Sequence, residues 1–241
     1  TYLPRIFFEF FEENKLFTAS SCQLQEIYHD TFSHALKLHF LVLSSNNITI
    51  VPGYAFRNNS EMQTLKLDHN SIQQLTADAF RGLTSLMTLK LSFNKITHLP
   101  LYIFDELEYL ETLELNNNRI AVISKGLFDR NHQVATINLE NNAITIIDNG
   151  TFDPITKTLT MLNLENNKCV NGLYHEDTNL TKLIECCTLS QEMKSCLLQS
   201  GHQDEETSMG VWVFLIILMI CGSTIFFALV MSGFLLCGSS S

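Results

Sequence analysis

The sequence is short of basic residues. It has 15 lysines and arginines against 25 aspartates and glutamates, which gives a formal net charge of −10 over 241 residues. Every charged residue lies before Thr207. Nucleic-acid binding needs a basic footprint, so this balance argues against a nucleic-acid partner.

Catalytic motifs are also lacking. The chain contains no G-x-S-x-G, no H-E-x-x-H, no Walker loop and no dinucleotide-binding fingerprint, and its eight histidines share no spacing. Catalysis needs groups that converge on one point. We therefore expect a binding protein and not an enzyme, with no catalytic residue, cofactor or metal.

What the chain does contain is a repeat of 24 residues. Phenylalanine recurs at this step, at Phe32, Phe56, Phe80, Phe104, Phe128 and Phe152. Asparagine recurs at the same step up to Asn142 and after 25 residues at the end, giving Asn46, Asn70, Asn94, Asn118, Asn142 and Asn167. Segments such as MQTLKLDHNSI and LMTLKLSFNKI fit the pattern L-x-x-L-x-L-x-x-N-x-L. This pattern resembles the leucine-rich repeat.

Each position of the pattern has a physical reason. Alternation puts Leu65 and Leu67 on the inner side of a short strand and the residues between them outside. The asparagine amide offers donors and acceptors to buried backbone groups of adjoining coils, so stacked asparagines form a structural ladder. Phenylalanine fills the convex side. The resemblance implies an α/β fold, a leucine-rich-repeat solenoid in the form of a parallel-strand horseshoe.

The chain divides into five predicted parts. The N-terminus begins in mid-repeat, because Leu3-Pro4 matches Leu99-Pro100, so we expect an array that lacks its first strand. The parts are repeats at 1–168 (about six or seven coils), a cysteine-containing cap at 169–200, a polar linker at 201–209, a transmembrane helix at 210–237 and a short tail at 238–241.

The predicted transmembrane helix rests on a run without charge, Val211 to Cys237. At 1.5 Å per residue, about 20 apolar residues cross a hydrocarbon core of ~30 Å. We expect a single-pass type I protein of the plasma membrane with extracellular repeats. A cleaved glycolipid-anchor signal, preceded by the small residues Ser200 and Gly201, is the alternative. The four-residue tail is too short for a signalling domain, which predicts a co-receptor or tethered binder.

Four cysteines close the predicted repeats: Cys169, Cys186, Cys187 and Cys196. Disulfides are favoured over zinc, because structural zinc ligands come in closely spaced pairs. Three pairings are possible, and the one with a bond between the adjacent Cys186 and Cys187 is geometrically disfavoured. One of these two could instead join a partner chain. The separate Cys22, at a ladder position, is expected to be reduced and buried.

Four Asn-x-Ser/Thr sequons predict N-glycosylation in the secretory pathway. They begin at Asn47, Asn58, Asn149 and Asn179.

Outward residues of the predicted strands form three columns. The first contains Thr64, Thr88, Thr112 and Thr136. The second contains Val42, Lys66, Lys90, Glu114, Asn138 and Asn163. The third contains Ser44, Asp68, Ser92, Asn116, Glu140 and Glu165. This concave sheet is the candidate ligand-binding face, with Phe40 and Phe93 as anchors, and its alternative is a merely solvated surface. Its lysines lie toward the N-terminal half and its acids toward the C-terminal half, a polarity that could orient a partner.

The cap narrows the resemblance. Toll-type ectodomains commonly close with N-P-W-x-C-x-C, whereas this chain reads Asn167-Lys168-Cys169-Val170. The cap resembles that of the transmembrane members of the mosquito leucine-rich-repeat immune proteins. The resemblance rests on Cys169, on the adjacent Cys186 and Cys187, and on the apolar run from Val211 to Cys237. That resemblance implies innate immunity and complement-like thioester proteins as partners, although the long coiled coil of the secreted members is missing. Residues 179–198 could form an amphipathic helix with Leu180, Leu183, Ile184 and Cys187 facing inward.

The expected function is therefore extracellular recognition at a membrane. The ligand would be a protein or a microbial surface, with a co-receptor or a disulfide-linked partner in addition. A cell-adhesion or developmental receptor of the same architecture is the rival.

Overall fold

The computed structural model describes residues 2–3, 13–170 and 172–175, together with Leu180, Leu183, Ile184 and Cys187. The predicted linker at 201–209, transmembrane helix at 210–237 and tail at 238–241 lie outside the described residues. Within the described part, no helix is both long and apolar enough to cross a membrane.

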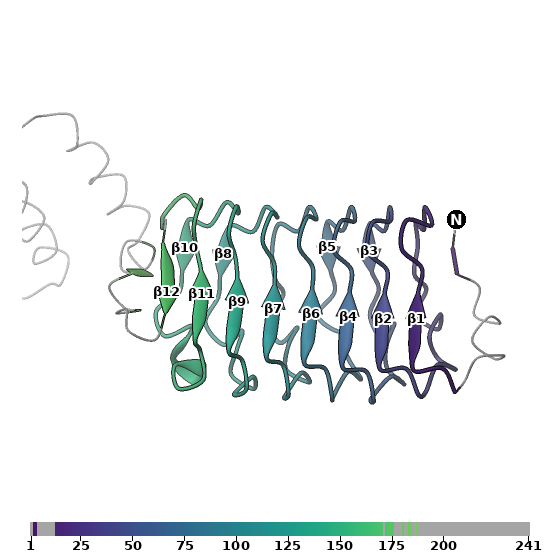
Figure 1. Ribbon diagram of the computed structural model, residues 1–241. Helices are drawn as coiled ribbons and strands as arrows, with labels where there is room; N and C mark the ends of the chain where they lie inside the picture. Colours follow the sequence, from purple (N-terminus) through teal and green to yellow (C-terminus); the bar gives the residue numbers. More distant parts are fainter. Residues whose placement is uncertain are drawn as a thin grey trace, which may run out of the picture. The chain divides into compact units, whose positions relative to one another are not determined.

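An eight-stranded sheet runs along one side of the repeats (Figure 1). In spatial order its strands are β1 (Leu16–Thr18), β2 (Phe40–Val42), β4 (Thr64–Lys66), β6 (Thr88–Lys90), β7 (Thr112–Glu114), β9 (Thr136–Asn138), β11 (Met161–Asn163) and β12 (Leu173–His175). The strands from β1 to β11 are parallel, one for each coil. Their register follows the repeat, since Leu65 pairs with Leu89 and Leu89 with Leu113. The predicted parallel-strand solenoid is confirmed.

The last strand was not anticipated from the sequence. β12 runs antiparallel to β11, and Tyr174 pairs with Leu162. The side chain of Tyr174 is only 8% exposed, so β12 adds to the core as well as to the sheet. It covers the backbone edge that β11 would otherwise present.

Turns and short strands return the chain behind the sheet. The short strands form two pairs, β3 (Ile50–Val51) with β5 (Gln74–Leu75) and β8 (Val122–Ile123) with β10 (Ile146–Ile147). In the coil between these two pairs, the equivalent residues are followed by Pro100. Pro100 has no N–H to donate to a neighbouring coil, which fits the gap between the two small sheets. Within residues 13–170 the only helical element is the 3₁₀ turn η1 (Asp153–Ile155), so the returning segments are not α-helices.

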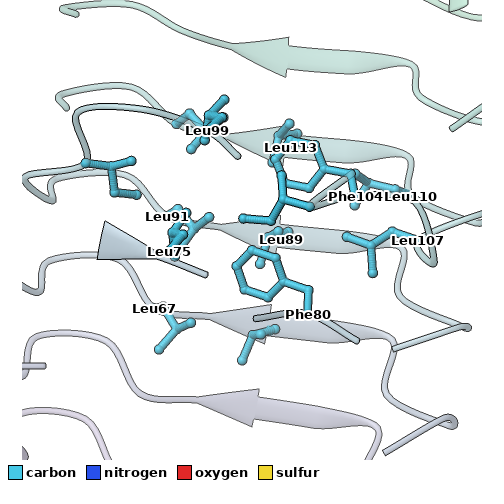
Figure 2. Packing of buried hydrophobic residues seen from close by; sticks show 14 of the residues in the cluster. Leu67, Leu75, Phe80, Leu89, Leu91, Leu99, Phe104, Leu107, Leu110 and Leu113 are labelled. Atoms are coloured by element: carbon cyan, nitrogen blue, oxygen red, sulfur yellow. The ribbon is translucent and has the colours of Figure 1, made fainter. Parts of the chain in front are cut away.

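The core contains two rows of apolar side chains. Strand leucines such as Leu89 and Leu113 are fully buried and pack with Phe80 and Phe104 (Figure 2). The phenylalanine rings stack from coil to coil, at centroid distances of 6.4 Å for Phe80 and Phe104 and 6.0 Å for Phe104 and Phe128. Stacked aromatic pairs add about 0.5–1.5 kcal/mol each beyond their buried area. The phenylalanines therefore hold neighbouring coils together opposite the sheet.

The asparagine ladder holds the other edge of each coil. Asn118 is representative: its Oδ1 accepts from Ile96 N–H at 3.0 Å, and its Nδ2 donates to the carbonyls of Leu91 and Leu115, each at 2.9 Å. Five more asparagines repeat this arrangement, namely Asn46, Asn70, Asn94, Asn142 and Asn167. Each one joins the backbone of neighbouring coils by hydrogen bonds that water would otherwise have to supply.

The prediction of a buried Cys22 is wrong. Cys22 is free, as expected, but it is exposed. Its neighbours Ser21 and Gln23 both have left-handed backbone, with φ of 56° and 55°. Asn46 of the next coil accepts the N–H groups of both Cys22 and Leu24 through its Oδ1. A thiol cannot reproduce the donors and acceptors of an asparagine, so the ladder begins at Asn46 and not at Cys22.

Two buried asparagines behind the sheet were also missed. Asn59 donates its Nδ2 to the carbonyls of Phe32 and Ala35 at 3.2 and 2.8 Å. Asn131 makes the equivalent pair of bonds to the coil before it, at 2.8 and 2.9 Å. Both replace an apolar residue of the repeat and add a second set of bonds between coils.

A disulfide joins the end of the repeats to the cap. It links Cys169 to Cys187, with their Cα atoms 5.1 Å apart. Near it, Leu180 and Leu183 pack against the core, and Ile184 is 7% exposed. These residues and Cys187 are helical and buried or half-buried, in keeping with the predicted inward side of an amphipathic helix. The other two predicted disulfide cysteines, Cys186 and Cys196, lie outside the described residues.

Candidate binding face

The candidate site is the outward side of the sheet, called here the strand face. It comprises the outward residues of β2, β4, β6, β7, β9 and β11 and the second and third residues after each strand, such as Ser92 and Phe93 after β6. The alternation that creates it is regular: Leu65 is buried, whereas Thr64 and Lys66 on either side are half-exposed. Strands β6, β7, β9 and β11 repeat this pattern. The period of two therefore separates core from surface on every coil.

The sheet register brings the predicted columns together. Thr64, Thr88, Thr112 and Thr136 pair in sequence across β4, β6, β7 and β9. Met161 takes the equivalent place on β11. Neighbouring members of a column lie about 4.8 Å apart, the ordinary spacing of strands. The strand face is thus a lattice of side chains with fixed separations.

The predicted charge polarity is weaker than the sequence suggested. Lys90 Nζ lies 2.6 Å from Glu114 Oε1, and both side chains are about one-third exposed. This pair neutralises the positive charge of Lys90. Within the described part of the chain Lys66 makes no ion pair, so Lys66 is the cation that the strand face leaves available to a partner.

The third column contains two hydrogen bonds between side chains of neighbouring coils. Ser44 Oγ donates to Asp68 at 2.7 Å, and Ser92 Oγ donates to Asn116 at 2.6 Å. At the C-terminal end, Asn138 Oδ1 accepts from the backbone of Glu140 at 3.0 Å. Side chains restrained in this way lose little freedom when they bind, which favours recognition.

Both predicted aromatic anchors are exposed. Phe40 lies at the start of β2, in line with the threonine column, and is 43% exposed. Phe93 lies in the turn after β6, is 46% exposed and stacks on His69 with ring centroids 4.3 Å apart. His69 was not identified from the sequence. The signal was present, because His69 and Phe93 are 24 residues apart and each precedes a ladder asparagine.

An ion pair marks the edge of the face beside Phe40. Lys37 Nζ donates to Glu61 Oε1 at 2.9 Å. This hydrogen bond raises the pKa of Lys37 and lowers the pKa of the Glu61 carboxyl. Both groups therefore stay charged at neutral pH. His39 Nε2 lies 3.9 Å from the second oxygen of Glu61.

Three of the sequon asparagines are described, and all three are exposed. They are Asn47, Asn58 and Asn149, whereas Asn179 lies outside the described residues. None of the three belongs to a column of the strand face. Glycans at these positions would leave the columns uncovered.

The described residues contain no group of three or more His, Cys, Asp or Glu side chains placed to hold a metal ion.

The chain belongs to the leucine-rich repeat family. The family model for the leucine-rich repeat matches residues 19–72, 60–120 and 108–168, which together cover more than half of the chain. The sequence has no significant match among curated proteins.

The solved structures that are similar to this chain include two complexes of Toll-type receptors. The TLR13–ssRNA13 complex matches 68% of this chain and 22% of its own, with 28% sequence identity and a TM-score of 0.59. The Drosophila Toll–Spatzle complex, a hub in development and innate immunity, matches 62% of this chain and 21% of its own, with 25% identity and a TM-score of 0.58. This chain thus spans about a fifth of the length of either protein.

The comparison with TLR13 bears on the expected absence of a nucleic-acid partner. One neighbour is a complex with RNA, so the fold does not exclude nucleic acid. The expectation that no nucleic acid binds then rests only on the excess of acidic over basic residues.

Proposed function

We propose that this protein recognises a protein or microbial ligand outside the cell through its strand face. The observation that carries the proposal is the preformed face itself. It presents the available cation Lys66, the acids Glu140 and Glu165, and the exposed ring of Phe93 on a sheet whose side chains are bonded to one another. Such a surface has fixed geometry and mixed chemistry, which suits specific binding to a macromolecule.

The similar structures support a receptor role. One of them is Toll in complex with Spatzle, a hub in Drosophila development and innate immunity. We propose an innate immune receptor or co-receptor, tethered to the plasma membrane as a type I protein through residues 210–237. The mosquito leucine-rich-repeat immune proteins remain the proposed subfamily, with the Cys169–Cys187 bond closing the cap.

Proximity labelling on intact cells would identify the partner. The full chain, with a labelling enzyme fused to the extracellular side, would be expressed on the surface of cells from the source tissue. Recovery of immune effectors is the expected result. Recovery of homophilic or neuronal surface proteins instead would favour an adhesion receptor, and exclusive recovery of cytosolic proteins would contradict the proposed topology.

Reversing the charge of Lys66 should weaken binding of the partner that proximity labelling identifies. We expect Lys66→Glu to raise Kd about tenfold at low salt, with a smaller difference at high salt, because screening reduces the interaction between exposed charges. The matched control is Arg57→Glu, which makes the same charge change on an exposed residue behind the sheet. Binding would be measured by biolayer interferometry between 50 and 500 mM salt. Equal effects of Lys66→Glu and Arg57→Glu would show that the partner does not bind through the strand face.

A further inference from the structure

A column of left-handed residues borders the strand face. The residue before each ladder asparagine has a positive φ, between 53° and 58°, as does Ser21 before Cys22; these residues are Ser21, Ser45, His69, Phe93, Asn117, Asn141 and Asn166. The N–H of each of several such residues still bonds to the next coil, as Phe93 N–H does to Asn116 O at 3.0 Å. The left-handed turn is therefore a structural requirement of the repeat at this position.

Phenylalanine is poorly suited to that backbone. Asparagine tolerates a positive φ, and histidine also occurs there, whereas a bulky ring at such a φ is an outlier. Asn117 and Asn141 show which residue the position accepts easily. Burial does not offset the strain at Phe93, because its side chain is 46% exposed. The repeat requires the left-handed backbone, so the unexplained feature is the bulky, exposed ring placed on it, and a strained choice of this kind points to a function.

The rings of His69 and Phe93 form one unit, called here the aromatic pair. Their planes are 8° from parallel and their centroids are 4.3 Å apart. The column places Ser45 before the pair and Asn117 after it, and neither of these residues carries a ring. The stacking holds the rings in place, so the pair is ordered before any partner arrives.

We propose that the aromatic pair is a stacking site for a planar side chain of a protein partner, either an aromatic ring or an arginine guanidinium. This inference rests on the proposed function and specifies what the strand face recognises. A flat group laid on an open ring continues the stack, and a guanidinium adds a cation–π attraction. Asp68, directly before His69, provides negative charge beside the pair for a basic neighbour in the partner.

The charge of the strand face favours a protein over RNA. Bases also stack on aromatic rings, but they arrive with phosphates. The columns carry four acids, Asp68, Glu114, Glu140 and Glu165, against two lysines, Lys66 and Lys90, and Lys90 is paired with Glu114. Phosphate oxygens would meet more negative than positive charge here.

The test is a selection of peptides on the full chain, purified in detergent. A phage library of random 12-residue peptides would be selected on the wild type, and affinities would be measured for Phe93→Asn, His69→Asn and Tyr102→Asn. Asparagine suits the left-handed position, so Phe93→Asn should melt at or above the wild-type temperature. Tyr102 is the matched control, because it is an aromatic residue at φ 67°, 65% exposed, in a turn behind the sheet.

We expect the selected peptides to share an aromatic residue or arginine and to bind Phe93→Asn and His69→Asn at least tenfold more weakly. Tyr102→Asn should stay within twofold of the wild type. If Phe93→Asn melted below the wild type, the aromatic pair would serve stability and not binding, which would overturn the proposal. So would a failure to select any peptide.

Two further outcomes distinguish this inference from the proposed function. Peptides that depend on Lys66 but not on Phe93 would overturn the aromatic pair and leave the strand face as the binding surface. A parallel selection with random single-stranded RNA covers the other partner class. RNA whose binding depends on Phe93, without such peptides, would overturn the assignment to a protein.

Discussion

Replacing Asn118 with leucine is expected to lower the free energy of unfolding by about 4 kcal/mol, because several buried polar groups lose their partners at about 1–3 kcal/mol each. The N–H of Ile96 and the carbonyls of Leu91 and Leu115 all bond to the Asn118 amide. Leucine offers none of them a partner. Urea denaturation of the purified chain, followed by circular dichroism, measures the loss.

The matched control for this substitution is Asn116→Leu. Asn116 is two residues away and half-exposed, and its Oδ1 accepts only the hydroxyl of Ser92 among the contacts described. A loss below about 1 kcal/mol is expected there, since water can replace that partner. Equal losses for Asn116 and Asn118 would show that the ladder does not hold the coils together.

Replacing Gly82 with alanine should destabilise the solenoid by about 3 kcal/mol, which combines left-handed backbone strain with overpacking. The φ of Gly82 is +94°, and a Cβ there would lie 2.5 Å from the Cα of Arg57 in the preceding coil. Backbone atoms cannot move aside as a flexible side chain can. The two coils would have to separate at this point. Thermal and urea unfolding of the purified variant would measure the effect.

Gly126→Ala separates the two causes. Gly126 has a similar φ of +87°, but a Cβ there would meet only the side chain of Asp129, at 3.7 Å. We expect a loss of about 1 kcal/mol from backbone strain alone. If Gly126→Ala lowered the free energy of unfolding as much as Gly82→Ala, the close approach of the coils at Arg57 would not contribute to the loss.

The repeat itself could be predicted from the sequence for a physical reason. A fixed step of 24 residues forces equivalent side chains into register, so the inward leucines, the ladder and the columns follow from counting. Thr64 beside Thr88 and Leu65 beside Leu89 are examples. Local periodicity contains this information in full.

Other features depend on contacts that periodicity does not encode. The antiparallel turn of β12 lies outside the repeat and is fixed by the packing of Tyr174. The exposure of Cys22 does not follow from its place in the repeat, and the pairing of Lys90 with Glu114 depends on rotamers across two strands. The 24-residue spacing of His69 and Phe93 is visible in the sequence, but the stacking of their rings and the left-handed backbone beneath them are not.

A glycan placed on the strand face tests the central claim most directly. Glu140→Thr converts residues 138–140 into a sequon at Asn138, in β9, whereas Thr156→Asn creates one at residue 156, behind the sheet. Glu140→Ala controls for loss of the carboxylate, and a glycosidase-sensitive mass shift shows which variants carry the added sugar. The measurement is capture, at the surface of cells that express each variant, of the partner found by proximity labelling. We predict that glycosylated Glu140→Thr loses capture while Glu140→Ala and glycosylated Thr156→Asn retain it. Full capture by the variant glycosylated at Asn138 would contradict recognition through the strand face.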